Sequence, residues 1–388
     1  MADSFASLSS HKNIRPIELA SKGKIYLDLL NIEHSWSGRM DVNLCNAFIM
    51  EAEQQLINAI ELFEKGYFDC AYYSMRSAVD LSTTMVYLAD MPDYERESYL
   101  DAWKSTADFP MQGQMIKQLS QRGNVFVDMK TQMPDFFSEA KRLSAELNKY
   151  VHKQGLQHFY VSRNHPCNQN KPIDAFVQEF EEYLKKCIGV VAVMRLAIDP
   201  FPILLMDKEA LYRCFDSITD PYSEDFVKEY IGASTIEQYK HTELYLGMYD
   251  FLSTMEEKHE ATFDVVKHQY IDSRKLDDIF KQIHLLSKND FVCVLIVSAS
   301  EKTVKVYCGN IFLVYYTDRN SSRKSMSWSS LDFKNFSEAE NLANQPYDEA
   351  YISVFYFDDE PYYVEHNELL TEDEINQMVE IVTDALSK

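Results

Sequence analysis

Hydrophobic residues recur at helical spacing through the first half of the chain. In residues 42–65 apolar side chains fall close to every 3.6 residues, and Gly66 follows as a typical C-terminal stop. These apolar positions are Leu44, Phe48, Ala52, Ile60 and Phe63. The pattern predicts an amphipathic helix over 42–65.

Three further segments continue this pattern. Residues from about Asp69, a candidate N-cap, to the Met91-Pro92 break form an apolar-rich run that would pair with the first helix as a hairpin. A strongly periodic segment from 133 to 153 and a long one ending before Asp199-Pro200 predict two more helices. We therefore expect a helical bundle over residues 41–200, preceded by an N-terminal segment, 1–40.

The pattern changes in the last third of the chain. Residues 201–286 are typical of a helical connector region. From 287 onward, runs rich in β-branched and aromatic residues predict an α+β domain whose strands pair as an antiparallel sheet. The expected strands are "FVCVLIVSA", "TVKVYCG", "IFLVYYT" and "AYISVFYF", and a helix with a Thr371/Glu374 capping box closes the domain. The expected fold class is mainly α with an α+β C-terminal domain.

Composition narrows the classes of function. A formal net charge of -23 argues against broad wrapping of nucleic acid, because phosphate would be repelled. The seven cysteines are scattered without a Cys-x-x-Cys pair, which is typical of reduced thiols.

The first residues lack the features of a secretory signal and no apolar run is long enough for a membrane span, so we expect a cytoplasmic protein. Phosphate-loop, dinucleotide-loop, serine-elbow and zincin motifs are absent, and we expect no cofactor and no metal.

Residues 147–172 depart from the acidic average, since they contain no Asp or Glu. This segment mixes cations with aromatic and imidazole rings, a combination that attracts phosphate and stacks on bases. The candidate nucleic-acid-binding residues are Lys149, Lys153, His158, Tyr160, Arg163 and Lys171. The alternative is a loop whose rings pack on the bundle while its lysines are solvated.

The hairpin sequence "ELFEKGYFDCAYYSMRSAVDL" and the later helix end "LNKYVHK" resemble the HEPN superfamily of prokaryotic helical-bundle proteins over about 41–200. The matching positions are Gly66, Tyr67, Arg76 and His152. The resemblance implies a bundle of four or five helices, frequently dimeric, in toxins, phage-defence proteins and RNA-processing factors. Active members are metal-independent ribonucleases in which an Arg and a His four to six residues later promote attack of the RNA 2'-hydroxyl.

The chain departs from the catalytic motif, because the nearest Arg before His152 is Arg142. Asn148 lies one helical turn before His152 and would keep a polar pocket without the charge. The leading hypothesis is a non-catalytic, homodimeric module that binds RNA or a nucleotide in bacterial stress or phage defence. Its alternative is a ribonuclease that combines His152 with a displaced Arg142 or Arg76.

A third hypothesis is a protein-interaction component that presents its aromatic-rich C-terminal domain to a partner. The aromatic positions in question are Tyr351, Phe355, Tyr356, Phe357, Tyr362 and Tyr363. In a strand, alternating aromatics usually divide between the core and one exposed row.

Overall fold

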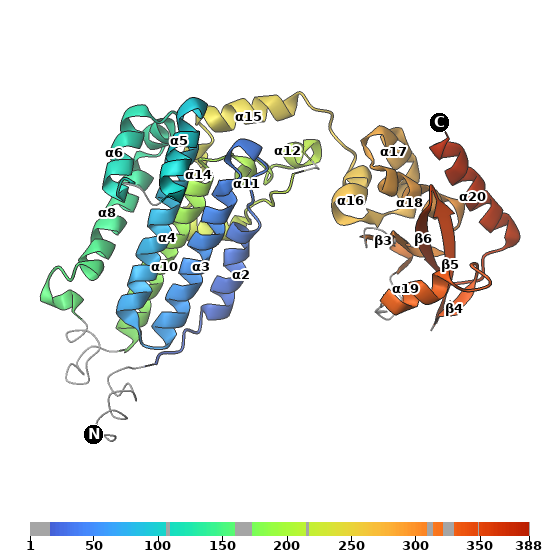
Figure 1. Cartoon of the computed structure of the whole chain (residues 1–388), viewed down its shortest axis with the longest axis horizontal. Helices are drawn as coiled ribbons and strands as arrows, with labels where there is room; N and C mark the ends of the chain where they lie inside the picture. The colour runs from blue at the N-terminus through green and yellow to red at the C-terminus, as the bar shows by residue number, and fades with distance from the viewer. Residues whose placement is uncertain are drawn as a thin grey trace, which may run out of the picture. The chain divides into compact units, whose positions relative to one another are not determined.

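The computed structural model describes residues 16–105, 109–159, 173–214, 217–308, 313–320, 330–347 and 349–387. The chain divides into two compact units, with the boundary along the sequence between Met255 and Glu256 (Figure 1). The first is all helical and the second combines helices with a sheet, so the expected fold class is confirmed. The connector expected over 201–286 is not a separate unit, because residues up to 255 belong to the first unit and the rest to the second.

The first unit is a helical bundle with α4 at its centre, packed against α3, α8 and α10 (Figure 1). Its longer helices are α2 (Lys22–Glu33), α3 (Leu44–Glu64), α4 (Phe68–Ala89), α5 (Asp93–Lys104), α6 (Gln112–Arg122), α7 (Val125–Gln132), α8 (Pro134–Val151), α10 (Ile173–Arg195) and α15 (Glu243–Ser253). Short elements complete it: η1 (Met40–Val42), η2 (Leu156–His158), α11 (Phe201–Leu204), α12 (Lys208–Arg213), α13 (Glu224–Phe226), the π-helix η3 (Val227–Ile231) and α14 (Ala233–Tyr239). The four helices expected from periodicity are thus confirmed.

The turn between α3 and α4 explains why these helices form a hairpin. Gly66 adopts a φ of 83°, a left-handed conformation that favours glycine. Its amide donates to the carbonyl of Phe63, and the Tyr67 amide donates to that of Leu62, which closes α3 in a Schellman-type turn. The N-cap expected at Asp69 is wrong, since α4 begins at Phe68 after Tyr67 and the Asp69 carboxylate instead pairs with Lys153.

Residues 16–40 are part of the bundle rather than a separate segment. Ile25, Leu29 and Ile32 of α2 are buried in its core. A buried ion pair fixes the chain that follows: the Arg195 guanidinium donates to Asp199 Oδ1 at 3.1 Å and to the carbonyl oxygen of Ser35 at 2.5 Å. The boundary expected at residue 40 therefore falls inside one packed unit.

The second unit is built on a mixed six-stranded sheet with the order β1-β3-β2-β6-β5-β4. The strands are β1 (Tyr270–Ile271), β2 (Thr303–Cys308), β3 (Leu313–Thr317), β4 (Gln345–Tyr347), β5 (Ala350–Phe357) and β6 (Glu360–His366). Pairs are antiparallel except for β1 and β3, which are parallel, so the expectation of a purely antiparallel sheet is corrected at that edge.

Helices cover both faces of the sheet. Successive residues of a strand point to opposite faces, and here both sets include apolar side chains that need to be buried. Val306 and Cys308 of β2 face a core shared with α18 and α20, whereas Tyr307 faces a second cluster with Phe336 of α19. The helical elements of the unit are α16 (Glu260–His268), η4 (Ser273–Lys275), α17 (Leu276–Lys281), η5 (Ile283–Leu285), α18 (Lys288–Ala299), η6 (Asp318–Asn320), α19 (Ser330–Ser337) and α20 (Glu372–Leu386). The capping box at Thr371 and Glu374 is confirmed.

The segment "FVCVLIVSA" is a helix, α18, and the strand expected there is wrong. Its helical start is fixed by a capping box: Ser287 Oγ accepts from the Asp290 amide at 3.2 Å, and the Asp290 carboxylate accepts from the Ser287 amide at 2.9 Å. α18 is buried between the sheet and α20, so every side is apolar and periodicity cannot distinguish it from a buried strand.

Candidate functional site

Two of the three catalytic candidates of α8 (Pro134–Val151), Arg142 and His152, are not brought together. His152 is the exposed C-cap of the helix, and Arg142 lies ten residues earlier, which places the two backbones roughly 15 Å apart along the axis. The Arg142 guanidinium is itself exposed and forms an ion pair with Glu139. A catalytic Arg and His therefore do not meet on this helix.

Asn148 instead meets Arg76 of α4. The Arg76 guanidinium donates from Nε to Asn148 Oδ1 at 2.9 Å and from Nη2 to Gln112 Oε1 at 2.8 Å, and it pairs with Asp80. Its side chain is only 12% exposed, and burial lowers the pKa of this guanidinium, which still stays charged at neutral pH. The cluster joins α4, α6 and α8 at one point.

The described part of the basic segment carries less free charge than the sequence indicates. The ammonium of Lys149 lies 2.6 Å from Glu146, and that of Lys153 pairs with Asp69. His158 is buried: its Nδ1 lies 2.6 Å from the carbonyl oxygen of Gln154, and its ring packs edge-on to Tyr150. The ammonium groups of Lys149 and Lys153 and the ring of His158 therefore bind other residues of the protein and do not form an open surface on which bases could stack.

Three residues predicted to bind nucleic acid lie outside the described residues. They are Tyr160, Arg163 and Lys171. Their contribution stays a prediction.

A cavity of about 360 Å³ opens beside the Arg76 cluster, between α4, α6, α7, α8 and α10. Its walls are mainly apolar and include three phenylalanine rings. The apolar lining is Val79, Gly113, Ile116, Phe126, Phe136, Phe137, Ala140, Ala145, Val190 and Met194. The polar lining is Thr83, Gln112, Lys130, Lys141, Ser144 and Asn148, and none of the described lining residues is acidic.

Two lysines at this cavity differ from those of the basic segment. Lys130 and Lys141 are exposed, and neither forms an ion pair with any residue that the structure describes. The Lys130 ammonium donates only to the hydroxyl of Ser120, at 3.1 Å. The protein as a whole has a net charge of -23, yet the ammonium groups of these two lysines are not neutralised by a described carboxylate.

The amides of Gln112 and Asn148 are oriented by Arg76. Because the oxygen of each amide accepts a hydrogen bond from Arg76, the amide nitrogens remain available to donate to other groups. Gln112 Nε2 lies 3.3 Å from the hydroxyl of Thr83, and Asn148 Nδ2 has no hydrogen-bond acceptor among the described residues. Asn148 thus offers amide donors to a ligand in the cavity.

Helical spacing places the α8 contribution on one face. Phe137, Lys141, Ser144, Ala145 and Asn148 are separated by four, three, one and three residues, so their side chains follow one stripe of the helix. Of these, the sequence singled out only Asn148. Lys130 and Lys141 were missed because only packing of five helices shows that they border the same cavity.

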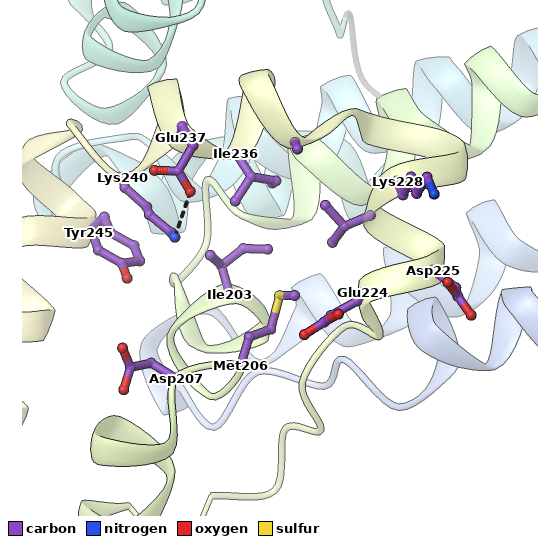
Figure 2. Close-up of a pocket in the computed structure, with 12 residues that line it drawn as sticks. Ile203, Met206, Asp207, Glu224, Asp225, Lys228, Ile236, Glu237, Lys240 and Tyr245 are labelled. Atoms are coloured by element: carbon purple, nitrogen blue, oxygen red, sulfur yellow. Dashed lines mark hydrogen bonds and ion pairs between the residues drawn. The ribbon is translucent and has the colours of Figure 1, made fainter.

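A larger cavity of about 530 Å³ lies between the loop after α11, α13, η3 and α14 (Figure 2). Ile203, Met206 and Ile236 line its apolar part. Four carboxylates and two ammonium groups surround it: Asp207, Glu224, Asp225, Glu237, Lys228 and Lys240. The Lys240 ammonium pairs with Glu237 at 2.8 Å, so the remaining charge is mostly negative and disfavours an anion.

Among the described residues, no group of three His, Cys, Asp or Glu side chains is placed to hold a metal ion. No helix in the described ranges is sufficiently long and apolar to cross a bilayer.

Comparison with known proteins found no matching family model, no matching curated protein and no matching solved structure. The resemblance to the HEPN superfamily therefore stays a prediction.

Proposed function

We propose that the chain is a non-catalytic binding protein whose helical bundle holds a nucleotide in the cavity between α4, α6, α7, α8 and α10. The observation that carries this proposal is the combination, in one cavity, of aromatic walls, oriented amides and two lysines without carboxylate partners. Ligand cavities in proteins are typically apolar clefts of about 300–1,000 Å³ with a few placed polar groups, and this cavity has that character.

The apolar part suits a nucleobase. Phe126, Phe136 and Phe137 line the cavity, and aromatic faces stack on any base at about 1–3 kcal/mol each. Asn148 Nδ2 is a donor for a ring nitrogen or an exocyclic oxygen of the base. Arg76 does not line the cavity and supports this contact indirectly, because it holds the amide in place through the amide oxygen.

The rim suits a phosphate. Lys130 and Lys141 are the exposed cations of the lining, and a phosphate oxygen would pair with them without first displacing a carboxylate. Lys149 and Lys153 would have to give up Glu146 and Asp69 to do the same. The lysines of the cavity therefore support an anionic ligand better than those of the basic segment.

A non-catalytic role agrees with the placement of the polar groups. The ribonuclease alternative needs a cation beside His152, but Arg142 pairs with Glu139 and Arg76 is held by Asn148, Gln112 and Asp80. The resemblance to HEPN proteins favours a cytoplasmic homodimer formed through the bundle and a part in bacterial stress or phage defence, and these remain proposals.

The protein-interaction alternative receives less support from the second unit. Phe355, Phe357, Tyr362 and Tyr363 are buried in its two hydrophobic clusters. Tyr356 is the exposed aromatic residue of the group, at 49%, and Tyr351 is partly buried. The aromatic strands are therefore mainly core.

The test is calorimetric titration of the full chain, in EDTA, with the four nucleoside 5'-monophosphates and the matching nucleosides. We expect a monophosphate to bind more tightly than its nucleoside. Lys141→Gln should weaken the monophosphate about fivefold, as expected for one partly exposed charge pair of about 1 kcal/mol, and should leave the nucleoside unchanged. Lys149→Gln is the matched control on the same helix and should change neither.

Absence of binding by all eight compounds would contradict the proposal. Loss of binding in Lys149→Gln with no effect of Lys141→Gln would instead favour RNA binding along residues 147–172.

A further inference from the structure

A third cavity lies elsewhere in the first unit, between α2, α3 and the chain near 218–220. Its volume is about 470 Å³, and its lining shares no residue with the proposed nucleotide cavity. Its lining combines carboxylates, including Glu33 and Glu53, with apolar side chains. Trp36, Met50 and Ile218 of the apolar set are exposed, and Ile57 is half-buried. The chemistry of this cavity is opposite to that of the nucleotide cavity.

Glu53 is the unusual member of the lining. It lies on the inner face of α3 and is only 8% exposed, yet it has no hydrogen bond or ion pair with any described residue. A buried carboxylate is normally paired, because an unpaired one loses its hydration without compensation. A cation in the cavity would supply the missing partner.

The neighbouring groups add a cation-binding environment. Trp36 is 40% exposed at the cavity, and its backbone carbonyl is held by the hydroxyl of Thr219. An indole face attracts a cation through its quadrupole. Met50 and Ile218 are 50% and 59% exposed, so an apolar group of a ligand that packs against them would remove apolar surface from water.

We propose that this cavity binds a small organic cation, a primary ammonium on a short apolar stem. The ammonium pairs with Glu53 and Glu33, and the stem lies against Trp36, Met50 and Ile218. A bare metal ion fits less well, because the apolar side chains of the lining offer it no oxygen ligands. This inference is independent of the nucleotide proposal, since the two sites have different residues and ligands of opposite charge.

The ionisation of Glu53 makes the binding depend on pH. Burial, followed by repulsion from Glu33, raises the pKa of Glu53 to about 7. The ammonium binds the ionised carboxylate, so its affinity should rise between about pH 6 and about pH 8. The other titratable groups at the cavity are His34 and Asp220, which lie 3.7 Å apart.

The experiment follows the fluorescence of the full chain, with Trp328 replaced by Phe, during titration with n-butylammonium and with 1-butanol. The two probes have the same stem and differ in charge. We expect binding of n-butylammonium about tenfold tighter at pH 8 than at pH 6, and no binding of 1-butanol in the same range. Glu53→Gln should weaken the ammonium at least tenfold at pH 8 and remove the pH dependence.

Glu51→Gln is the matched control, since Glu51 is an exposed carboxylate of α3 that does not line the cavity. It should leave the n-butylammonium affinity unchanged at both pH values. Equal binding of the two probes, or unchanged ammonium affinity in Glu53→Gln, would overturn the proposal. Because Glu53→Gln removes a buried unpaired charge and keeps the side-chain shape, we expect it to fold, and its unfolding curve checks this directly.

Discussion

Replacing Glu53 with glutamine should stabilise the first unit at alkaline pH and have little effect at acidic pH. In the folded protein, burial and repulsion from Glu33 raise the pKa of Glu53 from 4.5 to about 7. Between these values the folded state holds a proton that the unfolded state has released, so the free energy of unfolding falls as pH rises. Above about pH 7 the loss is complete.

The size of the effect follows from the same shift. At about 1.4 kcal/mol per pH unit, the difference between 4.5 and about 7 corresponds to about 3 kcal/mol. Glu53→Gln cannot ionise and avoids this loss. The stability gained over wild type should therefore be about 3 kcal/mol larger at about pH 8 than at about pH 4.

Urea unfolding monitored by tryptophan fluorescence measures this difference. With Trp328 replaced by Phe in each protein, Trp36 and Trp103 report on the first unit alone. Glu33→Gln is the control: Glu33 is exposed, and its removal only relieves repulsion on Glu53, so its pH-dependent effect should be smaller. The same stability difference at both pH values, or a destabilised Glu53→Gln at pH 8, would refute the reasoning.

Three further predictions, two on variants and one on the wild-type protein, test other parts of the structure. Arg195→Met leaves the buried Asp199 carboxylate without its cation and should destabilise the first unit by about 3–5 kcal/mol in urea unfolding, and equal stability would contradict this. Replacing Asp199 by Leu as well should restore only part of the stability, since the Ser37 hydroxyl and the Phe201 amide then lose their acceptor. Gly189→Ala places a Cβ against the carbonyl oxygen of Tyr230, where α10 meets η3, and should lower the stability by about 1–3 kcal/mol, whereas an unchanged melting curve would show that the contact is loose. Among the cysteines that the structure describes, Cys70 is exposed and the others are buried, so peptide mapping of the folded protein after brief iodoacetamide treatment should find Cys70 modified first, and faster modification of any buried cysteine would contradict this.

The bundle helices were predictable because their apolar residues face one side. α3 and α8 show the period clearly, and Gly66 marks the turn after α3. α18 lacked this signal, since it is apolar all round. Its capping box at Ser287 and Asp290 was the local feature that distinguishes it from a strand.

The candidate site was less predictable, because the sequence shows where charged residues occur but not which of them pair in the folded protein. Lys153 lies in a segment without acids, yet Asp69, far away in the sequence, neutralises it. Lys141 has Glu139 nearby in sequence, but that carboxylate pairs with Arg142. Only the folded arrangement shows which cations remain unpaired.

The central claim is that the cavity beside the Arg76 cluster holds a nucleotide. Ala145 lines this cavity at an exposed position of α8, so Ala145→Trp should fill its opening without disturbing the core. The most direct measurement is the affinity of the tightest-binding nucleoside monophosphate for wild type and for Ala145→Trp, with unfolding curves of both. We expect at least a tenfold loss of affinity with unchanged stability. Equal affinity in the two proteins would show that the nucleotide does not bind in this cavity.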